Sequence, residues 1–259
     1  MITTEQIKEL RDQTGVSVMQ CKKALEEAGG DMEKALMVLK KKSSDIAAKK
    51  SDREAAEGVV VIKKSAGKGI ILTLNCETDF VAKNSDFVDL ANVLADKALA
   101  DGIDAMKTAS VDMINPVVQK IGENIRLGDV AELSGAVMGS YVHDGKSGVL
   151  VSLSGGDETL GKDIAMHIAA MKPEYLKKED IPEEKRKLAT EMFETEVNAS
   201  DKPAEIKAKM LQGKIDTFFK EQTLLEQPFV KNPDTTINGL LQKAGNVTIS
   251  NFIRYTIGK

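Results

Sequence analysis

Residues 70–84 read Ile-Ile-Leu-Thr-Leu-Asn-Cys-Glu-Thr-Asp-Phe-Val-Ala-Lys-Asn, and this stretch decides the fold. Its first five residues form an apolar run typical of a buried strand, and a helical pattern begins directly after the stretch, at Ser85. The ten residues from Asn75 to Asn84 therefore form a strand-to-helix corner. This corner carries an acid, a large aromatic ring and a base where the chain should turn at the surface. Because loops that do more than connect elements often carry binding residues, the corner is the first candidate site.

The unit of two strands and a helix to which this corner belongs occurs twice. In each copy a glycine-bearing turn separates two apolar runs, which is the pattern of a β-hairpin, and a helical pattern follows. The first hairpin spans residues 58–74 and its helix 86–100, and the second hairpin spans 135–153 and its helix 159–171. A two-stranded sheet is only marginally stable, so each copy needs a third strand, for which 129–133 and 251–257 are the candidates. The duplication predicts an α+β protein whose core is two related subdomains with antiparallel sheets, at 56–134 and 135–259.

Ahead of this core, residues 1–40 predict three short helices. Ser17 and Asp31 can cap the second and third helices, and glycines at position 15 and at 29–30 can end the first and second. A three-helix unit of this size is a recognition module far more often than an enzyme. The Lys- and Ser-rich residues 41–55 that follow are typical of a partly helical linker.

A highly charged insert interrupts the second copy. Two helices are expected at about 182–197 and 203–224, and each begins at a proline. Alternating charge with a thin apolar stripe predicts a projecting antiparallel helical hairpin at about 174–227. The sequence leaves open whether this hairpin is a solvated spacer or an arm that contacts a partner.

The composition argues against several classes of function. With 42% hydrophobic and 29% charged residues, the 259-residue chain is typical of a soluble globular protein, and no apolar run approaches the length of a membrane span. The start of the chain lacks the pattern of a signal peptide, so we expect a cytoplasmic protein without membrane contact. The net charge of −4 and the absence of tryptophan argue against a direct nucleic-acid ligand. Cys21 and Cys76 lack zinc-ligand spacing, and no phosphate-binding loop is present, so no cofactor, metal or nucleotide is expected on this chain.

Several segments resemble the elongation factor Ts family. They are residues 14–25 (Thr-Gly-Val-Ser-Val-Met-Gln-Cys-Lys-Lys-Ala-Leu), the corner at 75–84, residues 121–125 (Ile-Gly-Glu-Asn-Ile) and 164–169 (Ile-Ala-Met-His-Ile-Ala), with shorter matches at 227–230 and 252–255. The resemblance implies an N-terminal ubiquitin-associated-like three-helix domain, two related α+β subdomains and an inserted coiled coil. It also implies a guanine-nucleotide exchange factor without bond-making chemistry of its own. Such a factor binds elongation factor Tu with GDP, disturbs the Mg²⁺ and phosphate site, and leaves a nucleotide-free complex that GTP can enter.

The same resemblance gives the corner the task of dislocating Mg²⁺ from the partner. The residues that carry this task are Thr78, Asp79, Phe80, Val81, Ala82, Lys83 and Asn84. Phe80 would be an exposed aromatic wedge, Asp79 would hold or displace polar groups beside it, and Lys83 and Asn84 would orient the loop. From the residues alone, Asp79 could instead cap a turn and Phe80 could be a core residue.

Further partner contacts are implied outside the corner. They fall on Arg11, Val18, Met19, Lys22, His167 and Val230. Helix packing is the alternative for Val18 and Met19. A lone histidine on an apolar helix is usually packed and hydrogen-bonded, so that alternative also stays open for His167.

Two other classes of function stay open. The chain could be a passive binding module that holds a partner without remodelling it. It could also be a metal-dependent hydrolase that uses His143, His167 and Asp79, although these residues share no ligand spacing. The chain stops at Lys259, shortly after the last expected strand, so we expect it to lack the extra C-terminal helical segment of some relatives and the partner contact of that segment.

Overall fold

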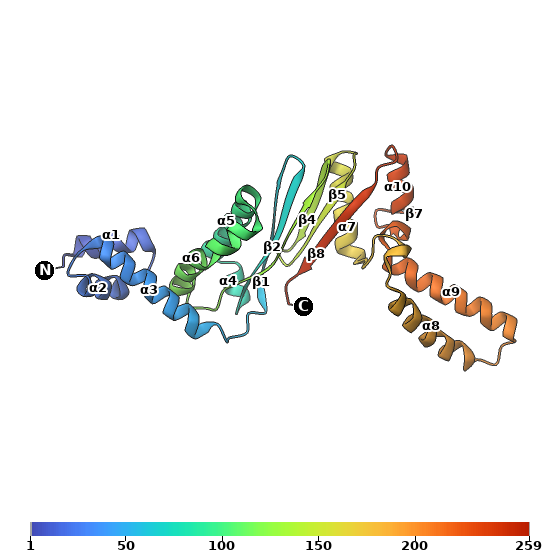
Figure 1. Cartoon of the computed structure of the whole chain (residues 1–259), viewed down its shortest axis with the longest axis horizontal. Coiled ribbons are helices and arrows are strands. Elements are labelled where there is room, and N and C mark those ends of the chain that lie inside the picture. Colours follow the sequence, from blue (N-terminus) through green and yellow to red (C-terminus); the bar gives the residue numbers. More distant parts are fainter. Residues whose placement is uncertain (1, 259) are drawn as a thin grey trace. The chain divides into compact units, whose positions relative to one another are not determined.

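The computed structural model describes residues 2–258, which fall into two compact units (Figure 1). Unit 1 contains the chain up to residue 132, together with 142–148 and the residues from 255 onward. Unit 2 contains residues 133–141 and 149–254. None of the helices in the described part of the chain combines the length and apolar character that crossing a bilayer requires.

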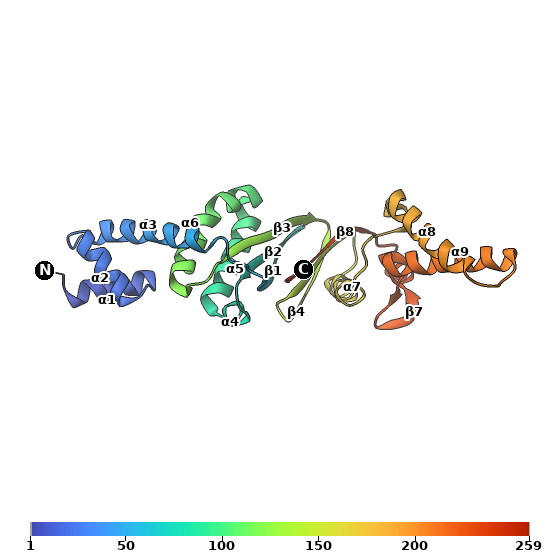
Figure 2. The ribbon, with the colours of Figure 1, turned by 90° about the horizontal axis from the view of Figure 1, so that it is seen from below.

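Unit 1 begins with three helices, as the sequence predicts. They are α1 (Thr4–Thr14), α2 (Val18–Glu27) and α3 (Met32–Lys50). Thr3, Ser17 and Asp31 cap them, because each side-chain oxygen accepts a hydrogen bond from the backbone N–H three residues later. The helix α3 continues through most of the stretch expected to be a linker. Its C-terminal half lies beside α6 (Ile103–Ile121) (Figure 2). This half stays helical because Ile46 and Ala47 pack on the hydrophobic core that α6 helps to form.

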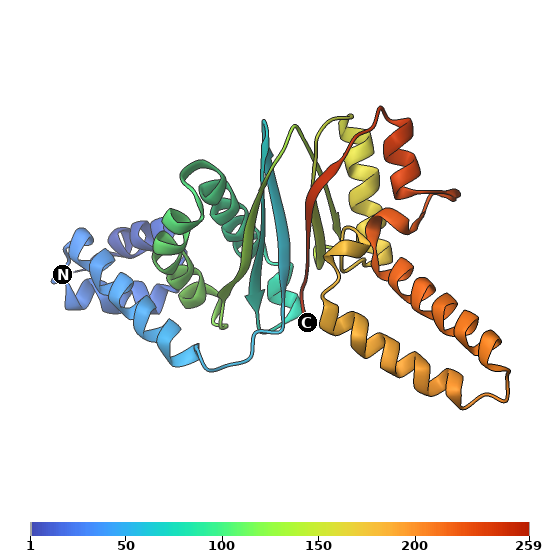
Figure 3. The same cartoon turned by 45° about the vertical axis from the view of Figure 1, so that its right-hand side comes forward.

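The first repeat builds a three-stranded sheet with the order β1-β2-β3. Its strands are β1 (Glu57–Ser65), β2 (Lys68–Cys76) and β3 (Arg126–Ser134), and the pair β1–β2 is antiparallel. The strand expected at 129–133 is thus confirmed as the third strand. Helix α5 (Ser85–Asp101) lies against this sheet (Figure 3). Its apolar side chains pack there, and Phe87 and Leu94 are fully buried. Helix α6 was not predicted from the sequence, and Pro116 interrupts its pattern.

The second repeat builds another three-stranded sheet, with the order β4-β5-β8. Its strands are β4 (Val137–His143), β5 (Ser147–Leu153) and β8 (Ile249–Thr256), so the strand expected at 251–257 is confirmed as the third. Helix α7 (Glu158–Met171) follows β5 and approaches β4 closely. A Cβ atom at Gly139 would lie 2.2 Å from the carbonyl oxygen of Gly161, so only glycine allows this approach.

The insert in unit 2 forms two helices that lie side by side (Figures 1 and 3). They are α8 (Glu183–Asn198) and α9 (Ala204–Gln222), held together by an edge-on contact of Phe193 with Phe218 and an ion pair of Lys214 with Glu196 at 2.7 Å. Short elements that the sequence did not predict flank the insert. They are η1 (Lys178–Asp180), η2 (Leu224–Glu226), β6 (Pro228–Phe229), β7 (Asn232–Thr236) and α10 (Ile237–Lys243).

Candidate functional site

The strand-to-helix corner after β2 holds a single exposed aromatic ring. One turn of helix, α4 (Asp79–Ala82), lies between β2 and α5, and the Thr78 hydroxyl caps it by accepting a hydrogen bond from the Val81 N–H at 3.3 Å. Val81 and Ala82 are buried in the core of unit 1, whereas the Phe80 side chain is 82% exposed. The corner therefore buries Val81 and Ala82 and exposes Phe80. The outward phenyl ring is free to bind a partner.

Charged side chains flank this ring. Lys83 Nζ donates to Asp79 Oδ2 at 2.9 Å across one turn of helix. This hydrogen bond, the charge of Lys83 and the more distant charge of Lys146 hold the pKa of Asp79 below its usual range. Lys146 itself pairs with Glu57 at 2.7 Å, and that contact raises the pKa of its ammonium group. The Asp79 carboxylate beside Phe80 is thus ionised at neutral pH.

The corner is tied to the segment after α6 by side chains that sequence reasoning did not single out. The N–H of the buried Asn124 donates to Glu77 Oε1 at 2.6 Å, and the Asn124 amide group donates to the carbonyl oxygen of Arg53, also at 2.6 Å. Arg53 in turn contacts Glu77 Oε1 at 3.4 Å. The only sequence signal for these contacts is that residues 121–125 share the family resemblance.

The four residues predicted in the N-terminal helices all lie at the surface. Arg11 and Lys22 are exposed, and the side chains of Val18 and Met19 are 52% and 67% exposed. The core of the three helices is built from other residues, namely Leu10, Val16, Cys21, Ala24, Leu25, Ala35 and Leu39. Packing inside this group of helices therefore does not account for Val18 and Met19, and both are available to a partner.

His167 is fully buried, in contrast to Phe80. The Val230 N–H donates to its Nδ1 atom at 3.2 Å, so Nε2 carries the ring proton and donates to Gln227 Oε1 at 2.9 Å. Burial lowers the pKa of His167, and the hydrogen bond to Gln227 opposes this only in part. The imidazole does not reach the surface, so a direct partner contact by His167 stays a prediction. What the ring does here is position the backbone of Val230, whose side chain is 44% exposed.

The arrangement of the candidate metal ligands and of the Cys76 thiol gives little support to metal binding or nucleophilic catalysis. Within residues 2–258, no group of three or more His, Cys, Asp or Glu side chains lies close enough to hold a metal ion. The thiol of Cys76 is buried and donates to the Thr78 carbonyl oxygen at 3.2 Å. Burial, and then the charge of Glu123, raise the pKa of Cys76 to about 12, so the thiol stays protonated and unreactive at neutral pH.

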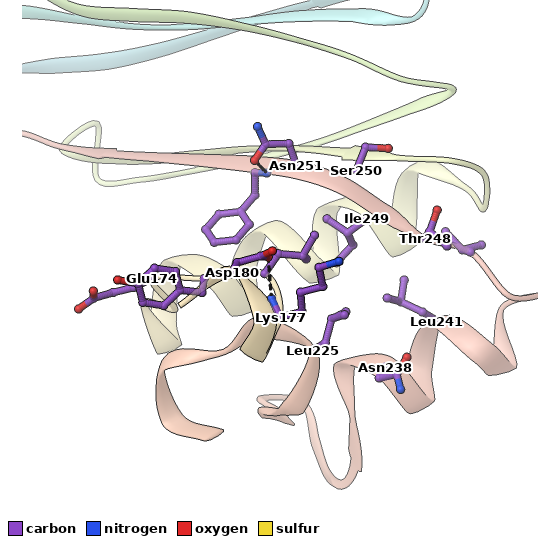
Figure 4. Close-up of a pocket in the computed structure, with 14 residues that line it drawn as sticks. Glu174, Lys177, Asp180, Leu225, Asn238, Leu241, Thr248, Ile249, Ser250 and Asn251 are labelled. Atoms are coloured by element: carbon purple, nitrogen blue, oxygen red, sulfur yellow. Dashed lines mark hydrogen bonds between the residues drawn. The ribbon is translucent and has the colours of Figure 1, made fainter. Parts of the chain in front are cut away.

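A pocket of about 700 Å³ lies in unit 2, away in sequence from the corner (Figure 4). Side chains of Lys177 and Asp180 line one side of it, and residues 247–252, mostly from β8, line another. None of the predicted site residues is part of its lining. The pocket therefore plays no part in the candidate site.

Comparison with known proteins places the chain in a family. The model of the family described as "Elongation factor TS" matches residues 77–259, beginning at the corner itself. The chain is 42% identical over 265 aligned residues to elongation factor Ts of Hahella chejuensis (strain KCTC 2396) and 42% identical over 261 to that of Pasteurella multocida (strain Pm70). It is 44% identical over 263 aligned residues to elongation factor Ts of Yersinia pestis (strain Pestoides F). Each alignment covers 100% of this chain and 92% of the relative. The chain belongs to the elongation factor Ts family.

Proposed function

We propose that this protein is the guanine-nucleotide exchange factor for elongation factor Tu in translation elongation. It binds the GDP-bound partner, displaces elements around the partner's Mg²⁺ and phosphate site, and leaves a nucleotide-free complex that GTP enters. Family membership supports the class of activity. The observation that carries the mechanism is the Phe80 ring, 82% exposed on a single capped turn of helix.

The physical argument rests on how Mg²⁺ is held. Mg²⁺ needs a nearly ideal octahedral set of oxygen ligands, so a small displacement of a ligand-bearing segment weakens its binding. A phenyl ring inserted between partner side chains supplies large apolar contact area with few torsions to order. The ionised Asp79 beside the ring compensates polar partner groups that the ring displaces.

The function needs no bond-making step on this chain. The factor and GDP each weaken the other's binding to the partner, and this coupling is reciprocal. Exchange is faster because the complex without nucleotide becomes accessible, while the GDP/GTP equilibrium stays the same. The protein therefore needs a rigid contact surface, and no nucleotide, nucleic acid or metal site of its own.

Docking and remodelling are assigned to separate surfaces. The exposed residues Arg11, Val18, Met19 and Lys22 on α1 and α2 form the docking surface of an N-terminal domain that we take to be ubiquitin-associated-like. Val230, with its backbone held by His167, provides a further contact. The paired helices α8 and α9 form the inserted coiled coil.

Release of a fluorescent GDP analogue from elongation factor Tu tests the proposal, with intact protein and Phe80→Ala compared. Removing a central aromatic contact typically costs about 2–4 kcal/mol, so we expect the acceleration to fall roughly 30- to 1000-fold. The matched control is Val111→Ala on α6, which truncates an apolar side chain that is 59% exposed and lies outside every predicted contact. It should keep full activity.

Two results would contradict the proposal. Full acceleration of GDP release by Phe80→Ala would refute the role of the Phe80 ring as a wedge. Tight binding of the partner by the intact chain without any acceleration would instead identify a passive binding module.

A further inference from the structure

The carboxylate of Glu123 binds the backbone immediately before the exposed ring. Its Oε2 atom accepts hydrogen bonds from the N–H groups of Glu77 and Thr78, both at 3.1 Å. Its Oε1 atom accepts from the Thr78 hydroxyl at 2.7 Å. Within residues 2–258 these three donors, with no cation, are the partners of the carboxylate.

The Thr78 hydroxyl links the Glu123 carboxylate to the helical turn that carries the Phe80 ring. While it donates to Glu123, it also accepts the hydrogen bond from the Val81 N–H that caps α4. The helix α4 has only four residues, and a helix of one turn is not stable on its own. The direction of the Phe80 ring thus depends on Thr78, and the position of Thr78 depends on Glu123.

Glu123 is itself fixed by the end of α6. Gly122 ends this helix in the left-handed conformation, with φ of +90°, and its N–H donates to the Val118 carbonyl oxygen at 2.8 Å. The Gly122 carbonyl oxygen also accepts a hydrogen bond from Lys50 Nζ at the end of α3. The Glu123 carboxylate therefore attaches the corner to this helix end, beside the hydrogen bond from the Asn124 N–H to Glu77.

We propose that Glu123 is a positioning residue for nucleotide exchange, because it keeps the Phe80 ring in its outward direction before the partner binds. This inference rests on the proposed function. If the ring lay on a flexible loop, part of the binding free energy would be offset by the entropy lost in ordering that loop. Because the corner is already ordered, that free energy is available to displace elements of the partner. Loss of Glu123 therefore lowers the rate of GDP release more than the strength of binding.

The mobility of the ring can be measured in the free protein. The chain contains no tryptophan, so Phe80→Trp places a single tryptophan, which can be excited apart from the three tyrosines, at an exposed position. We expect time-resolved anisotropy to show a clearly larger amplitude of fast motion when Glu123→Ala is added to this variant, because the loosened backbone then moves together with the exposed ring. The matched control adds Glu132→Ala instead, which removes a carboxylate that pairs with Lys68 at 2.9 Å at the opposite end of β2.

Exchange is then measured in the chain that keeps Phe80. For Glu123→Ala we expect the saturated rate of GDP release to fall about tenfold, with less than about a twofold change in the concentration giving half the effect, because binding surfaces remain and preorganisation is lost. Glu123→Gln keeps the shape and one acceptor oxygen, so its rate should lie between those of Glu123→Ala and the intact chain. It also serves in place of the alanine variant if that variant does not fold.

Several results would contradict the positioning role of Glu123 or the mechanism proposed for Phe80. Unchanged anisotropy in the Glu123 variants, or increased mobility with an unchanged GDP release rate, would overturn the positioning role. Weaker binding at an unchanged saturated rate would do the same, because it indicates a contact and no positioning. Full activity of Phe80→Ala would refute the proposed wedge mechanism, while the anisotropy result in the free protein would be unaffected.

Discussion

The two strand-to-helix corners of the repeat connect a strand to the following helix in different ways. In the second repeat, four residues lead from β5 to α7, and we name residues 154–157 the short corner. Gly156 turns the chain with φ of +83°, and Asp157 caps α7 by accepting from the Leu160 N–H at 2.7 Å. In the first repeat, residues 77–84, here the long corner, contain the extra turn α4 and the exposed Phe80.

The difference shows which residues the fold needs. The short corner proves that this strand–helix unit closes without α4. It is fastened to its own sheet region, because Ser154 N–H donates to the Thr248 carbonyl oxygen and Thr248 N–H donates to Ser154 Oγ, both at 2.9 Å. The long corner is fastened instead by Glu123 and Asn124, which follow another helix. The Phe80 ring on its extra turn is therefore available for binding, whereas Val81 and Ala82 of the same turn pack in the core.

The glycine that opens each repeat gives the largest expected effect on stability. A Cβ atom on Gly58 would lie 2.1 Å from the Leu74 carbonyl oxygen, just before the long corner, whereas one on Gly135 would lie 2.1 Å from the side-chain oxygen of Ser152. Backbone cannot move aside as a side chain can. We expect Gly58→Ala to cost about 2–3 kcal/mol in the free energy of unfolding, and Gly135→Ala about 1–2 kcal/mol.

Urea denaturation followed by circular dichroism measures this difference. Gly213→Ala on α9 is the control, since a Cβ atom there meets nothing within 4 Å and alanine should stabilise the helix by up to about 1 kcal/mol. Equal costs at Gly58 and Gly135 would mean that the two repeats accommodate the change alike, and the contrast between their corners would lose this support.

A pair of substitutions separates folding from binding at the corners themselves. Gly156→Ala places a side chain at φ of +83° and should cost about 1 kcal/mol or more in unfolding free energy, with no change in GDP release. Phe80→Ala removes an exposed ring and should change stability by less than about 0.5 kcal/mol while exchange is lost. Slower GDP release by a stably folded Gly156→Ala, or a large stability loss in Phe80→Ala, would break the comparison.

Local patterns were sufficient to predict the repeat. Both hairpins, the helix after each and both third strands follow from apolar runs, glycine-bearing turns and the need to complete a sheet. The N-terminal helices follow from their caps. Helix α6 did not follow, because Pro116 inside a helix is a signal for its end.

The site could be predicted in part only, because its supports come from distant parts of the chain. The Glu123 carboxylate and the Thr78 amide are 45 residues apart in sequence, and no local pattern links them. The exposure of a side chain is equally nonlocal. Phe80 precedes two buried residues and points outward, whereas His167 lies in a similarly apolar segment and points inward.

The smallest effect is expected from this buried histidine of the second repeat. Burial lowers the folded-state pKa of His167 below its ordinary value of 6.5, so the unfolded chain binds the proton more tightly. Stability should therefore be intact at pH 7.5 and fall as the pH drops through 6.5 toward 5.5. Protonation of Nδ1 would also set a donor against the Val230 N–H.

The measurement is the urea midpoint at pH 7.5 and 5.5 for the intact chain, His167→Gln and His143→Gln. His143 is the matched control, because its side chain is 63% exposed at the end of β4. The intact chain and His143→Gln should lose stability on acidification, and His167→Gln should lose clearly less. An equal loss in all three would assign the acid sensitivity to other groups. The proposed contrast between the two repeats would then lose this support. In that contrast, the second repeat buries His167 to hold the backbone of Val230, whereas the first repeat exposes Phe80 to a partner.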